Sequence, residues 1–171
     1  MAANKTVAII AEDGEKIGVI ANGLVRQNYR LLMVVKDRIP SAKILKLIKE
    51  GAPHADVEII DCMKDGCWEA DMIFIDIPDV AVKEVVEMIK EVATQKIVFS
   101  ISSYQDKNDG TGSLQNLLPH SKVVRAFNPP GLLGTFISGD DQDAVQTVFN
   151  ILKTAGYRPT ITDHIPGIKT S

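Results

Sequence analysis

The sequence predicts a three-layer, doubly wound α/β fold, in which a mostly parallel sheet lies between two layers of helices. Short apolar runs of four or five residues recur along the chain and are typical of buried strands. Between them lie segments whose apolar residues recur three, four and seven positions apart, as in amphipathic helices. The chain has 171 residues, 45% of them hydrophobic, so we expect a single domain over residues 1–171.

Four apolar runs in the first half predict strands, at residues 7–10, 31–35, 57–60 and 72–75. A first helix is indicated by apolar residues at helical spacing, namely Ile17, Ile20, Ala21 and Leu24. A second helix begins after Pro40 with Ser41 as its cap, ends at Gly51, and has one apolar face, formed by Ile44, Leu47 and Ile48. Residues 61–70 are expected to be irregular, with Trp68 as a packing residue.

The second half continues the alternation. A clear amphipathic helix has an inner face formed by Val82, Val85, Val86 and Ile89, and an outer face formed by Lys83, Glu84, Glu87 and Lys90. Apolar runs predict further strands at residues 96–101, 123–127, 133–138 and 157–163. The polar residues 102–113 are interpreted as a mobile loop, after which Ser113 caps a brief helix. Asp140 or Asp141 caps the last helix, and Gly156 ends it.

Composition excludes several classes of protein. A net charge of -3 argues against a nucleic-acid partner, and no apolar run approaches the ~20 residues that span a bilayer. The chain leads directly into a strand, so no signal peptide is expected. Cys62 and Cys67 are too far apart in sequence for a redox or zinc pair. We therefore expect a cytoplasmic protein with two reduced thiols and no membrane partner.

Ligands of doubly wound sheets bind beyond the carboxyl ends of the strands, where the strand order reverses. The first strand, turn and helix form the unit that holds a pyrophosphate in a Rossmann fold, whose signature is G-x-G-x-x-G. Gly14 and Gly18 are present here, but the turn is acidic, with Glu12, Asp13 and Glu15. These acids would repel a pyrophosphate, and Lys16 would offset part of that repulsion. Alternatively, the acids only stabilise the start of the helix.

The turn after the second strand favours a dinucleotide. Asp37 lies nineteen positions after Gly18, where an acid would bond the ribose hydroxyls of NAD. Lys36 and Arg38 flank it, and cations at this place favour the extra phosphate of NADP. The alternative is a solvated charged loop.

No catalytic constellation is visible in the sequence. Tyr104 and Lys107 are too close together for the familiar reductase pair, which needs one more residue between them on a helix. No serine lies in a nucleophile-elbow motif. The three histidines are scattered, so we predict no metal site: they are His54, His120 and His164.

Three segments of the second half carry a family resemblance. Residues 113–128, with the sequence VVRAFN at their end, residues 138–144, with GDD, and residues 155–159 are similar to the deazaflavin-dependent NADP reductases. The resemblance extends over most of residues 5–163. It implies an NADP-binding fold that positions a nicotinamide for hydride transfer rather than supplying protein acids or bases.

The resemblance also implies a set of cofactor-binding residues. Contacts to the phosphates would come from the start of the first helix, at Gly14, Glu15, Lys16 and Ile17. The 2′-phosphate would lie at Lys36 and Arg38. Contacts on the nicotinamide side would come from Ile77, Pro78 and Asn128.

The chain departs from the family pattern in three ways. Its glycine loop is degenerate and one residue longer, the segment between Asn128 and Ser138 is short, and the chain stops soon after Asp163. Family members continue there into helices that help to form the acceptor site and the dimer. The sequence thus predicts an NADP-dependent oxidoreductase with an unidentified small-molecule or cofactor acceptor, and a homodimer is compatible with the resemblance. The alternatives are a degenerate Rossmann protein that acts as a ligand sensor or assembly partner, and a purely structural subunit.

Overall fold

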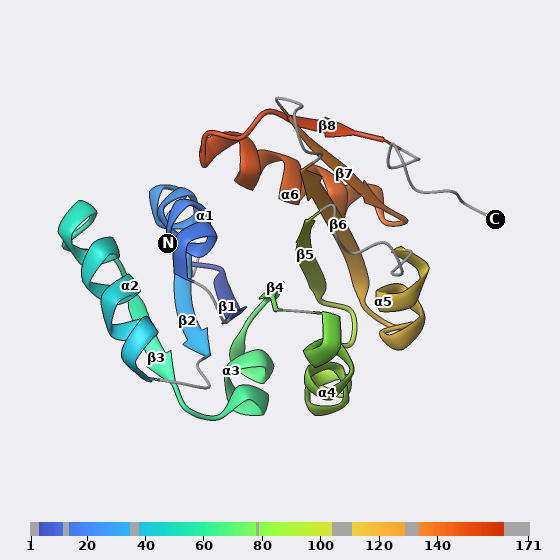
Figure 1. The fold of residues 1–171 in the computed structure, drawn as a ribbon, viewed down its shortest axis with the longest axis horizontal. Coiled ribbons are helices and arrows are strands. Elements are labelled where there is room, and N and C mark those ends of the chain that lie inside the picture. The colour runs from blue at the N-terminus through green and yellow to red at the C-terminus, as the bar shows by residue number, and fades with distance from the viewer. Residues whose placement is uncertain are drawn as a thin grey trace.

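The computed structural model describes residues 4–11, 14–34, 38–77, 79–103, 111–128 and 134–162. Their strands form one eight-stranded sheet with the order β3-β2-β1-β4-β5-β6-β7-β8 (Figure 1). The strands are β1 (Thr6–Ala11), β2 (Arg30–Val34), β3 (Val57–Ile60), β4 (Met72–Asp76), β5 (Ile97–Ser103), β6 (Lys122–Asn128), β7 (Thr135–Gly139) and β8 (Pro159–Ile161).

The sheet is parallel from β3 to β6, and β7 alone pairs antiparallel with its neighbour β6. β8 pairs parallel with β7, so these two strands run against the other six. The order 3-2-1-4-5-6 of the parallel part is the Rossmann order. The predicted doubly wound, mostly parallel sheet is therefore confirmed.

Helices cover both faces of the sheet, as Figure 1 shows. One layer consists of α1 (Gly14–Arg26), α2 (Arg38–Gly51) and α6 (Gln142–Thr154), and the other of α3 (Met63–Glu69), α4 (Asp79–Ile89) and α5 (Thr111–Leu117). Alternate residues of a strand point to opposite faces. In β1, Val7 and Ile9 pack in the core beneath α1, α2 and α6, whereas Ala8 and Ile10 pack in the core beneath α3 and α4. No helix among the described residues is both long and apolar enough to cross a bilayer.

The ends of α6 confirm two predictions. Asp141 is its N-cap and accepts a hydrogen bond from the Ala144 backbone N–H at 2.8 Å. At the other end Gly156 has φ +97, and the N–H groups of Gly156 and Tyr157 donate to the carbonyls of Lys153 and Leu152. This pair of bonds is a Schellman motif, which requires a residue with positive φ at the position of Gly156.

Two predicted helix starts are wrong. α2 begins at Arg38, so Ser41 lies inside the helix and does not cap it. Pro40 is placed in the first turn, where its missing N–H costs no hydrogen bond. α5 begins at Thr111, so Ser113 also lies within a helix. The predicted mobile loop falls largely on residues 104–110, which lie outside the described residues.

Three predictions about side chains and connections are also wrong. Residues 63–69 form helix α3, which is too short to show a helical period in the sequence. Trp68 on this helix is 72% exposed and is not a packing residue. Leu47, expected on the inner face of α2, is 61% exposed, whereas Ile44 and Ile48 are buried on that face.

Candidate functional site

The strand order reverses between β1 and β4. From β1 the chain moves outward through α1 to β2 and β3, and from β3 it returns through α3 to β4 on the other side of β1. The last residues of the two central strands, Ala11 and Asp76, are register partners. In a doubly wound sheet this is the place where ligands bind, because the connections diverge and leave a crevice.

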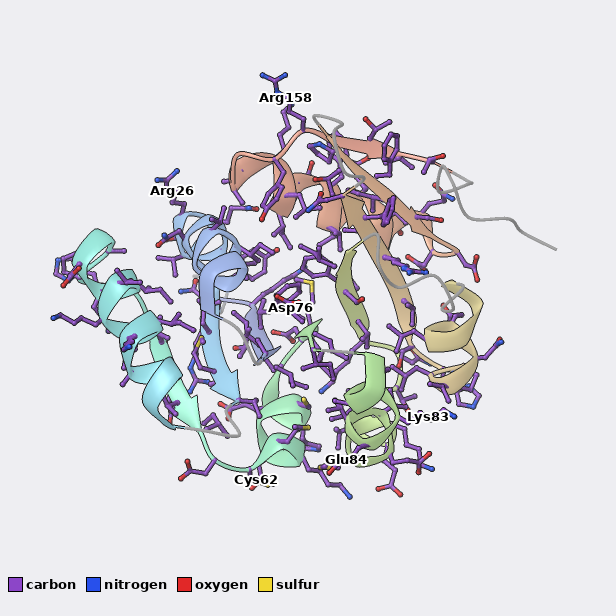
Figure 2. All side chains as sticks on the ribbon, in the orientation of Figure 1. Arg26, Cys62, Asp76, Lys83, Glu84 and Arg158 are labelled. Atoms are coloured by element: carbon purple, nitrogen blue, oxygen red, sulfur yellow. The ribbon has the colours of Figure 1, made fainter. Side chains whose placement is uncertain are left out.

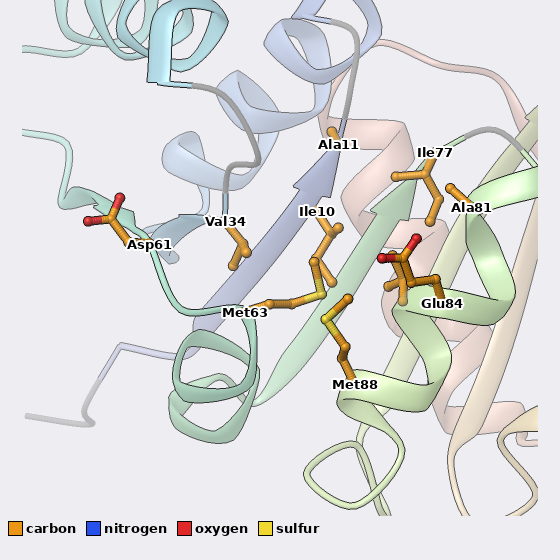
Figure 3. A pocket seen from close by; sticks show the side chains of 10 residues that line it. Ile10, Ala11, Val34, Asp61, Met63, Ile77, Ala81, Glu84 and Met88 are labelled. Atoms are coloured by element: carbon orange, nitrogen blue, oxygen red, sulfur yellow. The ribbon is translucent and has the colours of Figure 1, made fainter.

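A pocket of about 310 Å³ lies at this reversal, and we call it the switch-point pocket. Its lining comes from the ends of β1 and β2, from the residues that follow β3 and β4, from the start of α3 and from α4. Figure 3 shows the side chains: Ile10, Ala11, Val34, Asp61, Met63, Ile77, Ala81, Glu84, Val85 and Met88. The volume is within the range of small-molecule sites.

The pocket walls are mainly apolar, and two carboxylates flank them. Ile10 and Val34 form the floor from the sheet, while Met63 and Met88 supply flexible thioether side chains from α3 and α4. In Figure 3, Asp61 and Glu84 lie on opposite sides of the pocket. The lining therefore suits a flat apolar group that also carries hydrogen-bond donors.

Helix α1 begins at Gly14, three residues after the end of β1. Its first turn offers backbone N–H groups without helical partners at the carboxyl edge of the sheet. A Cβ added to Gly18 would meet no atom within 4 Å, so close packing does not require this glycine. Close packing does require a glycine at position 23, because a Cβ there would lie 2.6 Å from the Cβ of Ala155, the C-cap of α6.

The structure places the predicted cofactor-binding residues in different parts of this edge. Ile77 lines the switch-point pocket. The backbones of Gly14, Glu15, Lys16 and Ile17 form the start of α1, and the backbone of Arg38 begins α2, while their side chains lie outside the described set. Lys36 and Pro78 also fall outside the described residues. Asn128 ends β6, two strands from β4, and accepts a 2.6 Å hydrogen bond at Oδ1 from the Thr135 hydroxyl.

Sequence reasoning missed most of the pocket lining. Asp61 directly follows β3. The rule that ligands bind beyond the carboxyl ends of strands would have indicated it, had the rule been applied to the third strand as well. Glu84 was correctly expected on the exposed side of α4, but the same position also borders the pocket. Met63 gave no usable signal, because the helix that carries it was not predicted.

Polar residues also lie along the carboxyl edge of the sheet on its other face, beneath α1 and α6. Met72 and Phe74 belong to the core on that face, so Asp76, at the same alternation in β4, points to it as well. Asn128 in β6 and Thr135 in β7 share the face with Ala126 and Ile137. In Figure 2, Asp76 lies at the end of β4, between the helix layer that carries Arg26 and the layer that carries Glu84. Tyr157, partly buried, packs on this core from the turn after α6.

Two tyrosines packed on this core differ in their electrostatic surroundings. Burial raises the pKa of both Tyr29 and Tyr157 above the usual 10.0. For Tyr157, the negative charge of Asp76 raises the pKa further, so the hydroxyl lies within the field of that carboxylate. Tyr157 thus stays protonated at neutral pH.

Neither a metal cluster nor a thiol pair marks this region of the described residues. Within that part of the chain no group of three His, Cys, Asp or Glu side chains converges to hold a metal ion. Cys62 is exposed, whereas Cys67 is buried and both are free thiols.

The lining of the pocket suits an aromatic base better than a phosphate. Its apolar walls match an aromatic base, and a carboxylate accepts hydrogen bonds from an exocyclic amine or a ribose hydroxyl. Asp61 and Glu84 do not match a phosphate, since like charges repel. The donor groups that suit phosphates are the backbone N–H groups at the start of α1.

In sequence, no family model matches this chain, and no curated protein matches it either. In structure, a protein of Arthrobacter sp. FB24 assigned as an F420-dependent NADP reductase matches with a TM-score of 0.66 at 18% identity, over 93% of this chain and 84% of its own. A pyrroline-5-carboxylate reductase of Coxiella burnetii matches with a TM-score of 0.67 at 17% identity, over 94% of this chain and 59% of its own. A (S)-3-hydroxybutyryl-CoA dehydrogenase of Ralstonia eutropha matches with a TM-score of 0.67 at 13% identity, over 96% of this chain and 65% of its own.

This chain thus spans less than two thirds of the length of the second and third of these proteins. Membership of the deazaflavin-dependent reductase family stays a prediction, because identities this low show the fold alone. What the comparisons show is that the chain has the Rossmann fold found in these reductases and dehydrogenases.

Proposed function

We propose that this protein is an NADP-binding oxidoreductase that uses the carboxyl edge of the sheet to hold the dinucleotide. The observation that carries the proposal is the switch-point pocket, an apolar cavity of about 310 Å³ at the reversal of a Rossmann sheet. The similarity in fold to reductases and dehydrogenases supports the same class of reaction.

Each part of the edge has a role in this proposal. The pocket walls formed by Ile10 and Val34 receive the adenine ring, and the start of α1 receives the pyrophosphate. Lys36 and Arg38 hold the 2′-phosphate, and Pro78 and Asn128 lie on the nicotinamide side, whereas Ile77 borders the pocket that receives the adenine. A bound dihydronicotinamide supplies a hydride.

A second candidate function rests on the acidic character of the edge. Glu12, Asp13 and Glu15 precede or begin α1, and Asp61 and Glu84 flank the pocket. The acidic sequence of the first turn and the two carboxylates of the pocket oppose a ligand with several phosphate charges. In this alternative the protein binds NADP weakly or not at all and acts as a ligand sensor or assembly partner.

Calorimetric titration with NADPH distinguishes the two candidates. We expect the native chain to bind with a dissociation constant well below a millimolar, which corresponds to more than ~4 kcal/mol. Ala81→Phe fills the pocket from α4 and should weaken binding by about tenfold or more. Thr160→Phe places the same ring on the exposed strand β8, at the far edge of the sheet, and should leave binding unchanged.

A dissociation constant weaker than about a millimolar would reject the oxidoreductase proposal in favour of the second candidate. Equal binding by the native chain and Ala81→Phe would place the dinucleotide outside the switch-point pocket.

The preference for NADP over NAD depends on two cations. Replacing Lys36 and Arg38 together by Ala should weaken NADPH by about tenfold and NADH by much less, because only NADPH carries the 2′-phosphate. The matched control removes two exposed lysines farther along α2, Lys43 and Lys46, and should affect both nucleotides little. Equal losses for NADPH and NADH would contradict the assignment of the 2′-phosphate site.

A further inference from the structure

One side of helix α4 faces the switch-point pocket. Four residues of this helix line the pocket, at spacings of three, four and seven positions: Ala81, Glu84, Val85 and Met88. Residues at these spacings lie on the same side of a helix. Because the other three residues are apolar, Glu84 is the polar member of this side of α4.

The Glu84 carboxylate is available to a ligand. Figure 3 shows its side chain at the border of the pocket, on the side formed by α4. Within the described part of the chain, no hydrogen bond or ion pair engages this carboxylate. Glu87, one turn further along α4, differs because it pairs with Lys90 at 2.7 Å and does not line the pocket. The lone pairs of Glu84 are therefore left for water or for a bound molecule.

The second carboxylate of the pocket is in a different situation. Asp61 follows β3 and lies on the opposite side of the pocket from Glu84. Asp61 already interacts with another group of the chain, which holds its carboxylate in place. A hydrogen-bond donor on a molecule in the pocket therefore finds its free acceptor at Glu84.

A free carboxylate beside an apolar cavity discriminates between purine bases. When Ile10 and Val34 cover a face of the ring, the edge of the ring remains for polar contacts. Adenine carries an amino group at C6, which donates hydrogen bonds to a carboxylate. Hypoxanthine has the same ring system with an oxygen at C6, and that oxygen is an acceptor, which a carboxylate repels.

We propose that Glu84 selects the base of the dinucleotide. Its carboxylate accepts a hydrogen bond from the 6-amino group of adenine, and the pocket therefore favours an adenine nucleotide over a 6-oxopurine nucleotide. The inference rests on the proposed function, because it takes the switch-point pocket as the place of the base. It makes Glu84 a residue that determines specificity, at a position where the sequence indicated a solvent-exposed side of a helix.

The same carboxylate opposes the phosphates only weakly. The phosphates bind at the start of α1 in the proposed function, and a ribose separates them from the base. Glu84 is exposed to solvent, so salt screens its charge over a Debye length of about 8 Å. A direct hydrogen bond to the amino group involves no such separation. The contact with the base therefore outweighs the repulsion from the phosphates.

The test compares NADPH with deamino-NADPH, which carries hypoxanthine in place of adenine and is otherwise identical. Calorimetric titration of the native chain should give a dissociation constant for NADPH about tenfold or more below that for deamino-NADPH. Glu84→Gln should bring the two constants to within about threefold, because an amide accepts from an amino group and donates to an oxo group. Both ligands carry the same phosphates, so the ratio of the two constants is independent of the lost charge.

Two further variants serve as controls. Glu87→Gln removes the same charge from the same helix, outside the pocket lining, and should keep the native ratio of the two dissociation constants. Asp61→Asn changes the other carboxylate of the pocket and should affect both ligands alike, which also keeps the ratio. Glu84 and Glu87 are both exposed, so neither replacement disturbs the core.

The outcomes separate this inference from the proposed function. Loss of the preference for NADPH in Glu84→Gln, with the preference kept in both controls, supports the inference. A native chain that binds the two ligands equally overturns it, as does a preference that survives in Glu84→Gln or disappears in either control. A native chain that binds neither ligand overturns the proposed function itself, and this inference with it.

Discussion

Cys67 shows what burial does to a single titratable side chain in this fold. It lies on α3 beneath the sheet, fully covered, beside the buried Gly66. Burial raises the pKa of its thiol to about 12, and the nearby Lys96 ammonium opposes the shift without cancelling it. Lys96 donates 2.7 Å hydrogen bonds to the carbonyls of Cys67 and Trp68, where α3 ends. The thiol therefore remains neutral over the physiological range.

This pKa makes stability depend on alkaline pH. The unfolded thiol loses its proton near its ordinary pKa of 9.0, whereas the folded one keeps it until about pH 12. Between these values the folded state binds more protons, so the free energy of unfolding should fall by about 1.4 kcal/mol per pH unit. Urea denaturation between pH 9.5 and pH 11 measures the slope, which should flatten in Cys67→Ala but not in Cys62→Ala, the exposed thiol. Equal slopes in both variants would contradict the role of Cys67.

At the scale of elements, the contact between α1 and α6 depends on one glycine. Gly23 of α1 faces Ala155 at the end of α6, with no room for a methyl group between the helices. Gly18, one and a half turns earlier, faces open space. The glycine that resembles part of a nucleotide-binding signature is therefore dispensable for packing, and the glycine outside the signature is required.

Alanine substitutions should separate the two glycines. Gly23→Ala forces the helices apart and should lower the free energy of unfolding by roughly 1–3 kcal/mol. Gly18→Ala meets no obstacle and should raise it by up to about 1 kcal/mol, because alanine favours a helix more than glycine does. Urea denaturation of the two variants measures both effects. A Gly23→Ala protein as stable as Gly18→Ala would show that α6 adjusts its position without cost.

At the scale of the whole molecule, the sheet was predictable because its strands are buried on both faces. Such strands appear as continuous apolar runs, for example at residues 7–10 and 72–75, and the alternation with helices indicates a parallel sheet. Local signals also predicted Asp141 and Gly156 at the ends of α6. Helix α3 escaped prediction because seven residues around a glycine show no period.

The candidate site was less predictable, since distant segments build it. The pocket lining extends from Ile10 to Met88, and among the described residues that form it, Ile77 is the one that was expected to bind a cofactor. Tyr157 reaches the neighbourhood of Asp76 from eighty-one positions away, after α6 has crossed the sheet. The rule that ligands bind beyond the carboxyl ends of the strands predicts which edge of the sheet carries a site. It does not predict which side chains from other elements converge there.

The reversal of β7 against β6 has a consequence for how this scaffold can change. Because these strands are antiparallel neighbours, β6 ends and β7 begins at the same border of the sheet, and no helix has to cross a face between them. Extra residues inserted between Asn128 and Thr135 would leave the pairing of every strand intact. Such an insertion would extend the carboxyl edge of the sheet next to Asn128, so this connection can change in length and sequence while the arrangement of the strands stays the same.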